Sequence, residues 1–160
     1  MLYSTPNKLL VVGGADFSEG LFQEVYDSKI PIIAADGGAN ILAEYNISPE
    51  LIIGDLDSLS KQKVQNIDTK KIIKIADQNT TDLEKVLINT EASLTIGIGF
   101  LGSRIDHELA ALSALVKFSH KKIVLVGEKD INTGQYSLKN SDDETEEALT
   151  PAQIIEKLAS

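Results

Sequence analysis

Six short apolar runs, separated by helix-like stretches, constrain the fold of this 160-residue chain more than any other feature. The runs are nearly continuous in apolar residues, as are strands that a parallel sheet buries on both faces. They read KLLVVGG from residue 8, IPIIAADGG from 30, ELIIGDLD from 50, KIIKIAD from 71, SLTIGIG from 93 and KKIVLVG from 121. Strands that alternate with helices form parallel sheets covered on both sides. The sequence therefore predicts a three-layer α/β fold with a mostly parallel sheet of about six strands.

Apolar residues recur at helical spacing in three of the intervening stretches. These residues are Leu21, Phe22, Val25 and Tyr26, then Leu83, Val86 and Leu87, then Leu109, Leu112, Leu115 and Val116. The tetrapeptide TDLE, residues 81–84, also has the spacing of a capping box, in which Thr81 caps a helix and Glu84 reaches back to it. The capping box places Asp82 in the first turn of a helix.

The alternating pattern stops after Val126. We expect one α/β domain over residues 1–130 and an acidic linker without periodicity over 131–149. A short C-terminal helix is expected over 150–160, with Thr150 as its N-cap.

Composition narrows the function classes. The chain has 24 Asp+Glu against 15 Lys+Arg, a formal net charge of −9, which argues against non-specific binding to nucleic acid or to an anionic membrane. It has no cysteine, so any metal would be bound through oxygen or imidazole. No apolar run approaches the roughly 20 residues of a membrane span, and the N-terminus lacks a signal-like core. We expect a cytoplasmic protein.

Two aspartates, Asp55 and Asp57, directly follow the third apolar run. If the extended conformation continues past Gly54, they share one face of the strand. Ligands of open α/β sheets bind beyond the carboxyl ends of the strands, where this face lies. Two neighbouring carboxylates repel each other unless a cation such as Mg²⁺, a hard ion that binds carboxylates and phosphates, lies between them. An ordinary Asp/Ser turn is the alternative explanation.

Three further strand ends carry polar and glycine residues. They are Asp36, Gly37 and Gly38 after the second run, Asp77, Gln78, Thr81 and Asp82 after the fourth, and Gly99, Gly102, Arg104, Asp106 and His107 after the fifth. Each group alone has the composition of a common turn. Arg104, near glycines and a helix start, also suits a phosphate. Four acidic loops at one edge of a sheet together favour a ligand site.

The motifs ADGGAN, GDLDS, DQNTTD and GSRIDHELA, in this order and spacing, resemble the catalytic domain of thiamine pyrophosphokinase over roughly residues 8–128. The resemblance implies a Rossmann-like fold and an Mg²⁺-dependent enzyme of thiamine diphosphate biosynthesis. Such an enzyme transfers the pyrophosphoryl group of ATP to the hydroxyl of thiamine and releases AMP. The implied partners are Mg²⁺, ATP, thiamine or another small hydroxyl acceptor, and a second copy of the chain in a homodimer.

The resemblance also implies roles for individual residues. It places Asp55, Asp57 and Asp82 around the metal and the phosphates, with Asp106 beside them at the catalytic centre. The residues implied to contact ATP or its phosphates are Asp36, Gly37, Gly38, Asn40, Gln78, Thr81, Gly102 and Arg104.

The chain departs from the family pattern in two places. Ser103 stands where the family commonly has a second glycine. We expect the family's second domain, a β-sandwich that helps to form the thiamine pocket, to be missing or replaced after Val126. A different acceptor is therefore an open alternative.

Two other functions remain open from the sequence. The motif DLDSL imitates a phosphatase of the haloacid-dehalogenase type, with Asp55 as nucleophile and Asp57 as acid, but it follows the third strand rather than the first. The motif GIGFLG, residues 97–102, has the glycine spacing of a dinucleotide fingerprint, and Glu128 follows at the distance of a ribose-binding acid. A non-catalytic nucleotide-binding module is the second alternative.

Overall fold

The computed structural model describes residues 1–60, 62–102, 104–127, 136–139, 146–149, 153 and 156–157. Its centre is a six-stranded sheet of order β5-β4-β3-β2-β7-β8, in which every neighbouring pair is parallel. The strands are β2 (Lys8–Val12), β3 (Ile32–Ala35), β4 (Leu51–Gly54), β5 (Ile72–Lys74), β7 (Leu94–Ile98) and β8 (Ile123–Val126). All six expected strands are confirmed.

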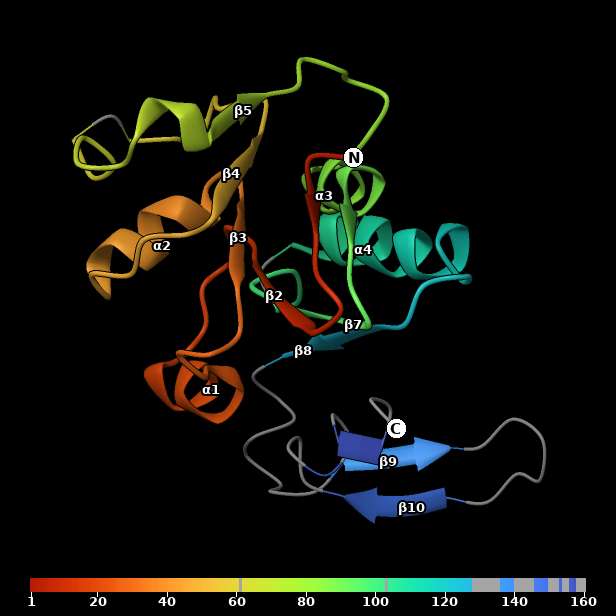
Figure 1. Ribbon diagram of the computed structural model, residues 1–160. Helices are drawn as coiled ribbons and strands as arrows, with labels where there is room; N and C mark the ends of the chain where they lie inside the picture. Colours follow the sequence, from red (N-terminus) through yellow and green to blue (C-terminus); the bar gives the residue numbers. More distant parts are fainter. Residues whose placement is uncertain are drawn as a thin grey trace.

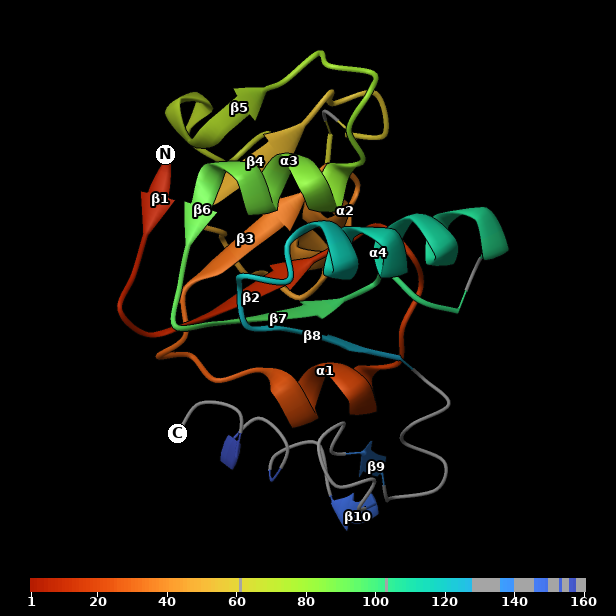
Figure 2. The same ribbon diagram turned by 90° about the vertical axis from the view of Figure 1, so that its right-hand side faces the viewer.

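Helices cover both faces of this sheet (Figures 1 and 2). One face carries α1 (Glu19–Val25) and α2 (Gly38–Glu44), and the other carries α3 (Asp82–Asn89) and α4 (Ile105–Lys117). A short 3₁₀ helix, η1 (Thr69–Lys71), precedes β5. The sequence analysis did not predict α2, because its glycine-rich start has the composition of a turn and only a short apolar pair follows.

Two small strand pairs lie outside the main sheet. The parallel pair is β1 (Tyr3–Ser4) with β6 (Thr90–Glu91), and the antiparallel pair is β9 (Tyr136–Lys139) with β10 (Glu146–Leu149).

Both strands of the second pair fall in the stretch expected to be an acidic linker, residues 131–149. The sequence analysis predicted no strand in this linker, and β9 and β10 correct it there, because backbone pairing needs no apolar periodicity. The remainder of that stretch and Thr150 lie outside the described residues. Of the expected C-terminal helix, Gln153, Glu156 and Lys157 are described, and all three are helical. The division at residue 130 stays a prediction.

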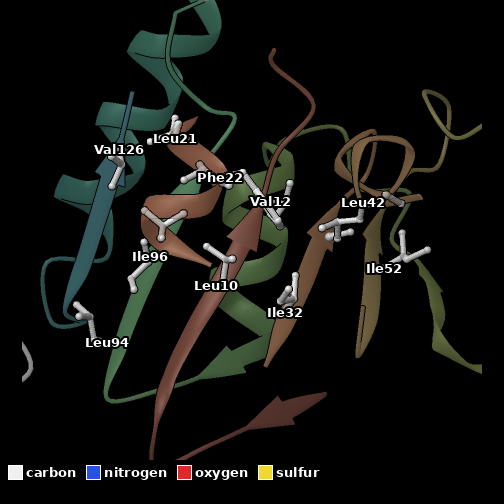
Figure 3. Packing of buried hydrophobic residues seen from close by; sticks show 14 of the residues in the cluster. Leu10, Val12, Leu21, Phe22, Ile32, Leu42, Ile52, Leu94, Ile96 and Val126 are labelled. Carbon is white, nitrogen blue, oxygen red and sulfur yellow. The ribbon is translucent and has the colours of Figure 1, made fainter. Parts of the chain in front are cut away.

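Alternate residues along the strands pack into opposite layers. Leu10 and Val12 of β2 pack with Phe22 of α1, in the cluster drawn in Figure 3. Leu9 and Val11 point to the other face and belong to the cluster of α3. A sheet buried on both faces explains why its strands read as continuous apolar runs rather than as alternating ones.

Helix α4 forms where the sequence predicts it, but its buried face is a different one. Leu109, Leu112 and Val116 belong to the apolar stripe that predicted the helix, and they are 62%, 48% and 77% exposed. Ala111 and Ala114 are buried instead, in the cluster shared with α3. The small alanine side chains let the two helices approach closely, and alanine contributes little to an amphipathic pattern. Within the described part of the chain, no helix has the length and apolar character that a membrane span requires.

The order of the strands fixes where a ligand would lie. From β2 the chain adds β3, β4 and β5 toward one edge, and it then returns to place β7 and β8 on the other side of β2. The switch in direction therefore falls between β2 and β7. In sheets of this kind the crevice beyond the carboxyl ends, at the switch, is the usual binding site.

Candidate active site

A cavity of about 660 Å³ opens at the carboxyl ends of the strands. Eight of the residues predicted from the sequence line it: Asp36, Gly37, Asn40, Asp55, Gln78, Thr81, Asp82 and Arg104. Four others do not line it: Gly38, Asp57, Gly102 and Asp106. The expectation that the acidic loops converge at one edge of the sheet is therefore confirmed for most of its residues.

The chain turns sharply after β4. The strand ends at Gly54, and Leu56 has φ +68°, in the left-handed region. The extended conformation assumed for Asp55 and Asp57 is therefore wrong. The turn nevertheless brings the two side chains together, with the Asp57 amide donating to Asp55 Oδ1 over 3.5 Å. One carboxylate oxygen from each of Asp36, Asp55 and Asp57 lies within 4.8 Å of the others.

Asp36 is the buried member of this acidic cluster, here defined as Asp36, Asp55 and Asp57. It is 2% exposed, and its φ of +41° turns the chain out of β3. The Ser58 amide donates to its Oδ2 over 3.3 Å, while Oδ1 is buried and has no hydrogen-bond partner among the described residues. Burial raises the pKa of Asp36 above its ordinary value. An unpartnered buried oxygen beside two further carboxylates fits a hard divalent cation, which binds oxygen ligands.

Asn40 of α2 holds the loop that carries Asp57. Its Nδ2 donates to the Ser58 carbonyl over 2.7 Å, and its Oδ1 accepts from the Ser60 amide over 2.8 Å. Ser58 in turn donates from Oγ to Asp57 Oδ1 over 3.0 Å. Asn40 therefore orients the acidic cluster through the backbone of this loop.

Lys85 is a site residue that the sequence analysis missed. It lines the cavity but is only 3% exposed, and its Nζ lies 3.1 Å from Asp82 Oδ1 and 3.6 Å from Asp55 Oδ2. Burial opposes its charge, but the hydrogen bond and charge of Asp82, with the charge of Asp55, raise the pKa of Lys85 above its ordinary value. The sequence analysis considered only a metal ion as the cation that would relieve the repulsion at Asp55, and Lys85 supplies a positive charge there from a distant part of the sequence. The spacing from Asp82 to Lys85 predicts one pair on a helix, but not the contact with Asp55.

Asp55 is held as a carboxylate by several neighbours. Partial burial opposes its ionisation, but the hydrogen bond from the Asp57 amide and the charge of Lys85 hold the pKa of Asp55 below its ordinary value. Gln78 Nε2 lies 3.5 Å from Asp55 Oδ2 and favours the same charged form. Asp82, predicted as a metal ligand, lies outside the acidic cluster and is paired with Lys85. Its role at a metal stays a prediction.

The capping box at the start of α3 is confirmed. Thr81 Oγ1 accepts from the Glu84 amide over 3.2 Å, and Glu84 Oε2 accepts from the Thr81 amide over 2.9 Å. Lys117 of α4 donates to Glu84 Oε1 over 2.8 Å. The hydrogen bond from Lys117 lowers the pKa of Glu84, despite partial burial. These contacts fix the helix that presents Asp82 and Lys85.

Arg104 and Asp106 form a two-point ion pair at the start of α4. Arg104 Nη2 lies 2.5 Å from Asp106 Oδ2, and Nε lies 3.1 Å from Oδ1. The hydrogen bonds of Arg104 lower the pKa of Asp106. Gly102, with φ +98°, donates its amide to the side chain of Glu108. Ser103 lies outside the described residues, and the catalytic role of Asp106 stays a prediction.

One glycine of the GIGFLG motif, Gly97, lies against the aromatic ring of Phe100, and so does Gly13, which follows β2. A β-carbon on Gly97 would meet the Phe100 ring at 3.2 Å, and one on Gly13 would meet it at 2.7 Å. Gly97 and Gly13 therefore make room for Phe100, whereas a β-carbon on Gly99 would meet the Gly13 carbonyl and one on Gly102 would meet nothing within 4 Å. Glu128, the acid of the proposed dinucleotide fingerprint, lies outside the described residues.

Other cavity residues were not predicted from the sequence. They are Gly14, Ala15, Asp16, Ala35, Ile41, Glu44, Ser58, Lys63, Thr80, Leu83, Phe100, Ala110 and Ala111. Gly99 and His107, which the sequence placed after the fifth run, also line the cavity. The GGAD segment at 13–16 follows the first apolar run as the other loops follow theirs, and the same strand-end argument applied to it would have found Asp16.

Solved structures share this fold. Thiamin pyrophosphokinase from Geobacillus thermodenitrificans matches with a TM-score of 0.65 and 21% identity, over 84% of this chain and 67% of that one. Yeast thiamin pyrophosphokinase matches with a TM-score of 0.64 and 21% identity, over 84% of this chain and 62% of that one.

Curated relatives match in sequence. Thiamine pyrophosphokinase 1 of Arabidopsis thaliana is 31% identical over 60% of this chain and 46% of its own length. Thiamin pyrophosphokinase 1 of Caenorhabditis elegans is 36% identical over 54% of this chain and 40% of its own length. The chain thus spans less than half the length of these relatives. The sequence model of the family described as thiamin pyrophosphokinase, catalytic domain, matches residues 22–126. With the fold and the acidic loops in agreement, the chain belongs to the thiamin pyrophosphokinase family.

Proposed function

We propose that the chain transfers the pyrophosphoryl group of ATP to the hydroxyl of thiamine, giving thiamine diphosphate and AMP, with Mg²⁺ as the cation. The observation that carries this proposal is the acidic cluster of Asp36, Asp55 and Asp57, in which one oxygen of each carboxylate lies within 4.8 Å of the others. Asp36 and Asp55 line the cavity. Membership in the family supplies the reaction, and three carboxylates supply the ligands that a Mg·ATP complex needs.

The protein groups have separate tasks in this reaction. The acidic cluster would hold the cation, and Arg104 would bind phosphate oxygens with its planar fork of donors. Gly37, which lines the cavity without a side chain, lets the backbone approach the nucleotide. When bound, a divalent cation neutralises the phosphate charge and polarises the phosphoryl group. Positioning and charge neutralisation would account for most of the catalysis.

The test is incubation with ATP, Mg²⁺ and thiamine, followed by chromatography of AMP and thiamine diphosphate. Both products should appear, and Asp57→Asn should lower their rate of formation by at least about tenfold, which corresponds to about 1.4 kcal/mol, because the cluster loses one carboxylate charge. The matched control is Asp27→Asn: Asp27 is an exposed aspartate that also accepts an amide two residues on, 2.9 Å from Lys29 N, and it lies outside the cavity lining.

Other outcomes separate the alternatives. AMP without thiamine diphosphate would indicate a different hydroxyl acceptor. Binding of Mg·ATP with no AMP would indicate a non-catalytic nucleotide-binding module. A phosphoryl group trapped covalently on Asp55 would indicate the phosphatase mechanism.

A further inference from the structure

Lys85 brings a positive charge into the lining of the cavity. It is 3% exposed, in the helix α3, where Leu83 and Val86 are also buried. A buried ammonium is strongly unfavourable unless carboxylates or other acceptors surround it. Asp82 and Asp55 are those partners, with oxygens 3.1 Å and 3.6 Å from Nζ. The protein therefore maintains a fixed cation beside the acidic cluster.

Asp55 lies between the acidic cluster, which would hold a metal ion, and the ammonium group of Lys85. On one side it belongs to the acidic cluster with Asp36 and Asp57, where the Asp36 Oδ1 has no partner among the described residues. On the other side its Oδ2 faces the Lys85 ammonium, which also contacts Asp82. A divalent cation between Asp55 and Asp82 would have to occupy the place of Nζ and would be repelled by its charge.

We propose that Lys85 takes the place of a second metal ion, so that the chain binds one divalent cation, on Asp36, Asp55 and Asp57. An ammonium has three donors. In the part of the chain that the structure describes, Nζ donates one hydrogen bond, to Asp82 Oδ1 over 3.1 Å, and faces Asp55 Oδ2 at 3.6 Å. A further donor would be directed to a phosphate oxygen that enters the cavity. In this arrangement the task of Asp82 is to position Lys85. The inference rests on the metal-binding part of the proposed function, but not on the transfer reaction.

The experiment counts Mn²⁺ ions bound per chain by electron paramagnetic resonance of the free ion, without nucleotide or thiamine. The wild type should bind one ion at saturation. Lys85→Met, which removes the charge at similar length, should bind two, with the second at least about tenfold tighter than any second ion of the wild type, because the repelling charge is gone. Lys85→Arg keeps the charge and should bind one.

Lys117→Met is the matched control. Lys117 also pairs with a carboxylate of α3, 2.8 Å from Glu84 Oε1, but it does not line the cavity. This variant should bind one ion with unchanged affinity. Two ions on the wild type, or one ion on Lys85→Met, would overturn the proposal.

Loss of Lys85 leaves Asp55 and Asp82 without their cation, so folding has to be checked by circular dichroism. Lys85→Gln, which keeps donors without the charge, provides a second variant and should also bind two ions. If neither variant folds in EDTA, Mn²⁺ should restore folding with two ions bound, since binding to the native state alone stabilises it. Failure to refold in millimolar Mn²⁺ would count against the proposal.

The result separates this inference from the transfer reaction. One ion on the wild type and one on Lys85→Met would refute the role of Lys85 and leave the reaction intact. The expected ion counts together with no thiamine diphosphate formation would refute the reaction alone.

Discussion

Gly54 and Asp36 are in such close contact that a β-carbon built on Gly54 would lie 2.7 Å from the Asp36 Cβ. Gly54 is the last residue of β4, and Asp36 directly follows the neighbouring strand β3. The side chain of Asp36 occupies the space that a side chain at position 54 would fill. The placement of the buried carboxylate in the acidic cluster therefore depends on a glycine that contributes no ligand.

Gly54→Ala should displace Asp36 and lower the free energy of unfolding by about 1–3 kcal/mol, as overpacking of a close contact does. Mn²⁺ binding should weaken with it, because Asp36 leaves the cluster. Denaturant unfolding and Mn²⁺ titration measure the two effects. The control is Gly20→Ala in α1, where the nearest atom to the added carbon lies at an ordinary 3.6 Å. Unchanged Mn²⁺ affinity in Gly54→Ala would show that Asp36 is not a ligand.

Asp36→Asn should stabilise the metal-free protein at pH 7. Because burial raises the pKa of Asp36, the folded state binds the proton more tightly than the unfolded chain. The contribution of Asp36 to stability is therefore fully present below the unfolded pKa and falls as the pH rises through the folded pKa. Asn does not ionise and escapes this loss.

Unfolding curves across the pH range check this prediction. The advantage of the variant should disappear in acid, where Asp36 is protonated in both states. The same variant should bind Mn²⁺ at least about tenfold more weakly, the cost of one lost charge-assisted ligand. A variant less stable than the wild type at pH 7 in EDTA would contradict the account of Asp36 as a buried, partly unsatisfied acid.

Arg104 and Asp106 should differ in their effect on Mg·ATP binding although they form one ion pair. Arg104 lines the cavity, whereas Asp106 does not. We expect Arg104→Ala to raise the dissociation constant of Mg·ATP at least about tenfold, by loss of charge-assisted hydrogen bonds. Asp106→Asn should leave binding unchanged or tighter, because it releases Arg104 for the phosphates. Isothermal calorimetry gives both constants, and equal weakening by the two variants would place Asp106 in the binding site.

The exposed stripe of α4 should tolerate substitution. Leu109→Gln removes a side chain that is 62% exposed and should change the free energy of unfolding by no more than about 0.5 kcal/mol. Leu87→Ala on α3, where the leucine is fully buried, should cost about 2–5 kcal/mol. Chemical denaturation compares the two. A large cost for Leu109→Gln in dilute solution would mean that something covers this face of α4.

The sequence determined the elements whose signals are local. Each strand of the main sheet is an apolar run, and Thr81 and Glu84 cap a helix at a spacing that a single helical turn imposes. Parallel strands in turn place their following loops at one edge, so the presence of Asp36, Asp55 and Asp82 near one another followed from the pattern alone. The sequence did not predict helix α2, because the glycine-rich segment at its start has the composition of a turn.

Only the tertiary structure decided which carboxylates approach each other and what lies between them. Asp36 joins Asp55 because Gly54 leaves space for it, and Lys85 reaches Asp55 because α3 packs across the end of β4. The buried face of α4 likewise depends on the close approach of α3 and α4 through Ala111 and Ala114. The leucines of α4 had predicted that the opposite face would be buried. Periodicity and spacing report the conformation of a segment, whereas contacts between segments depend on how the layers pack, and a local pattern does not contain that information.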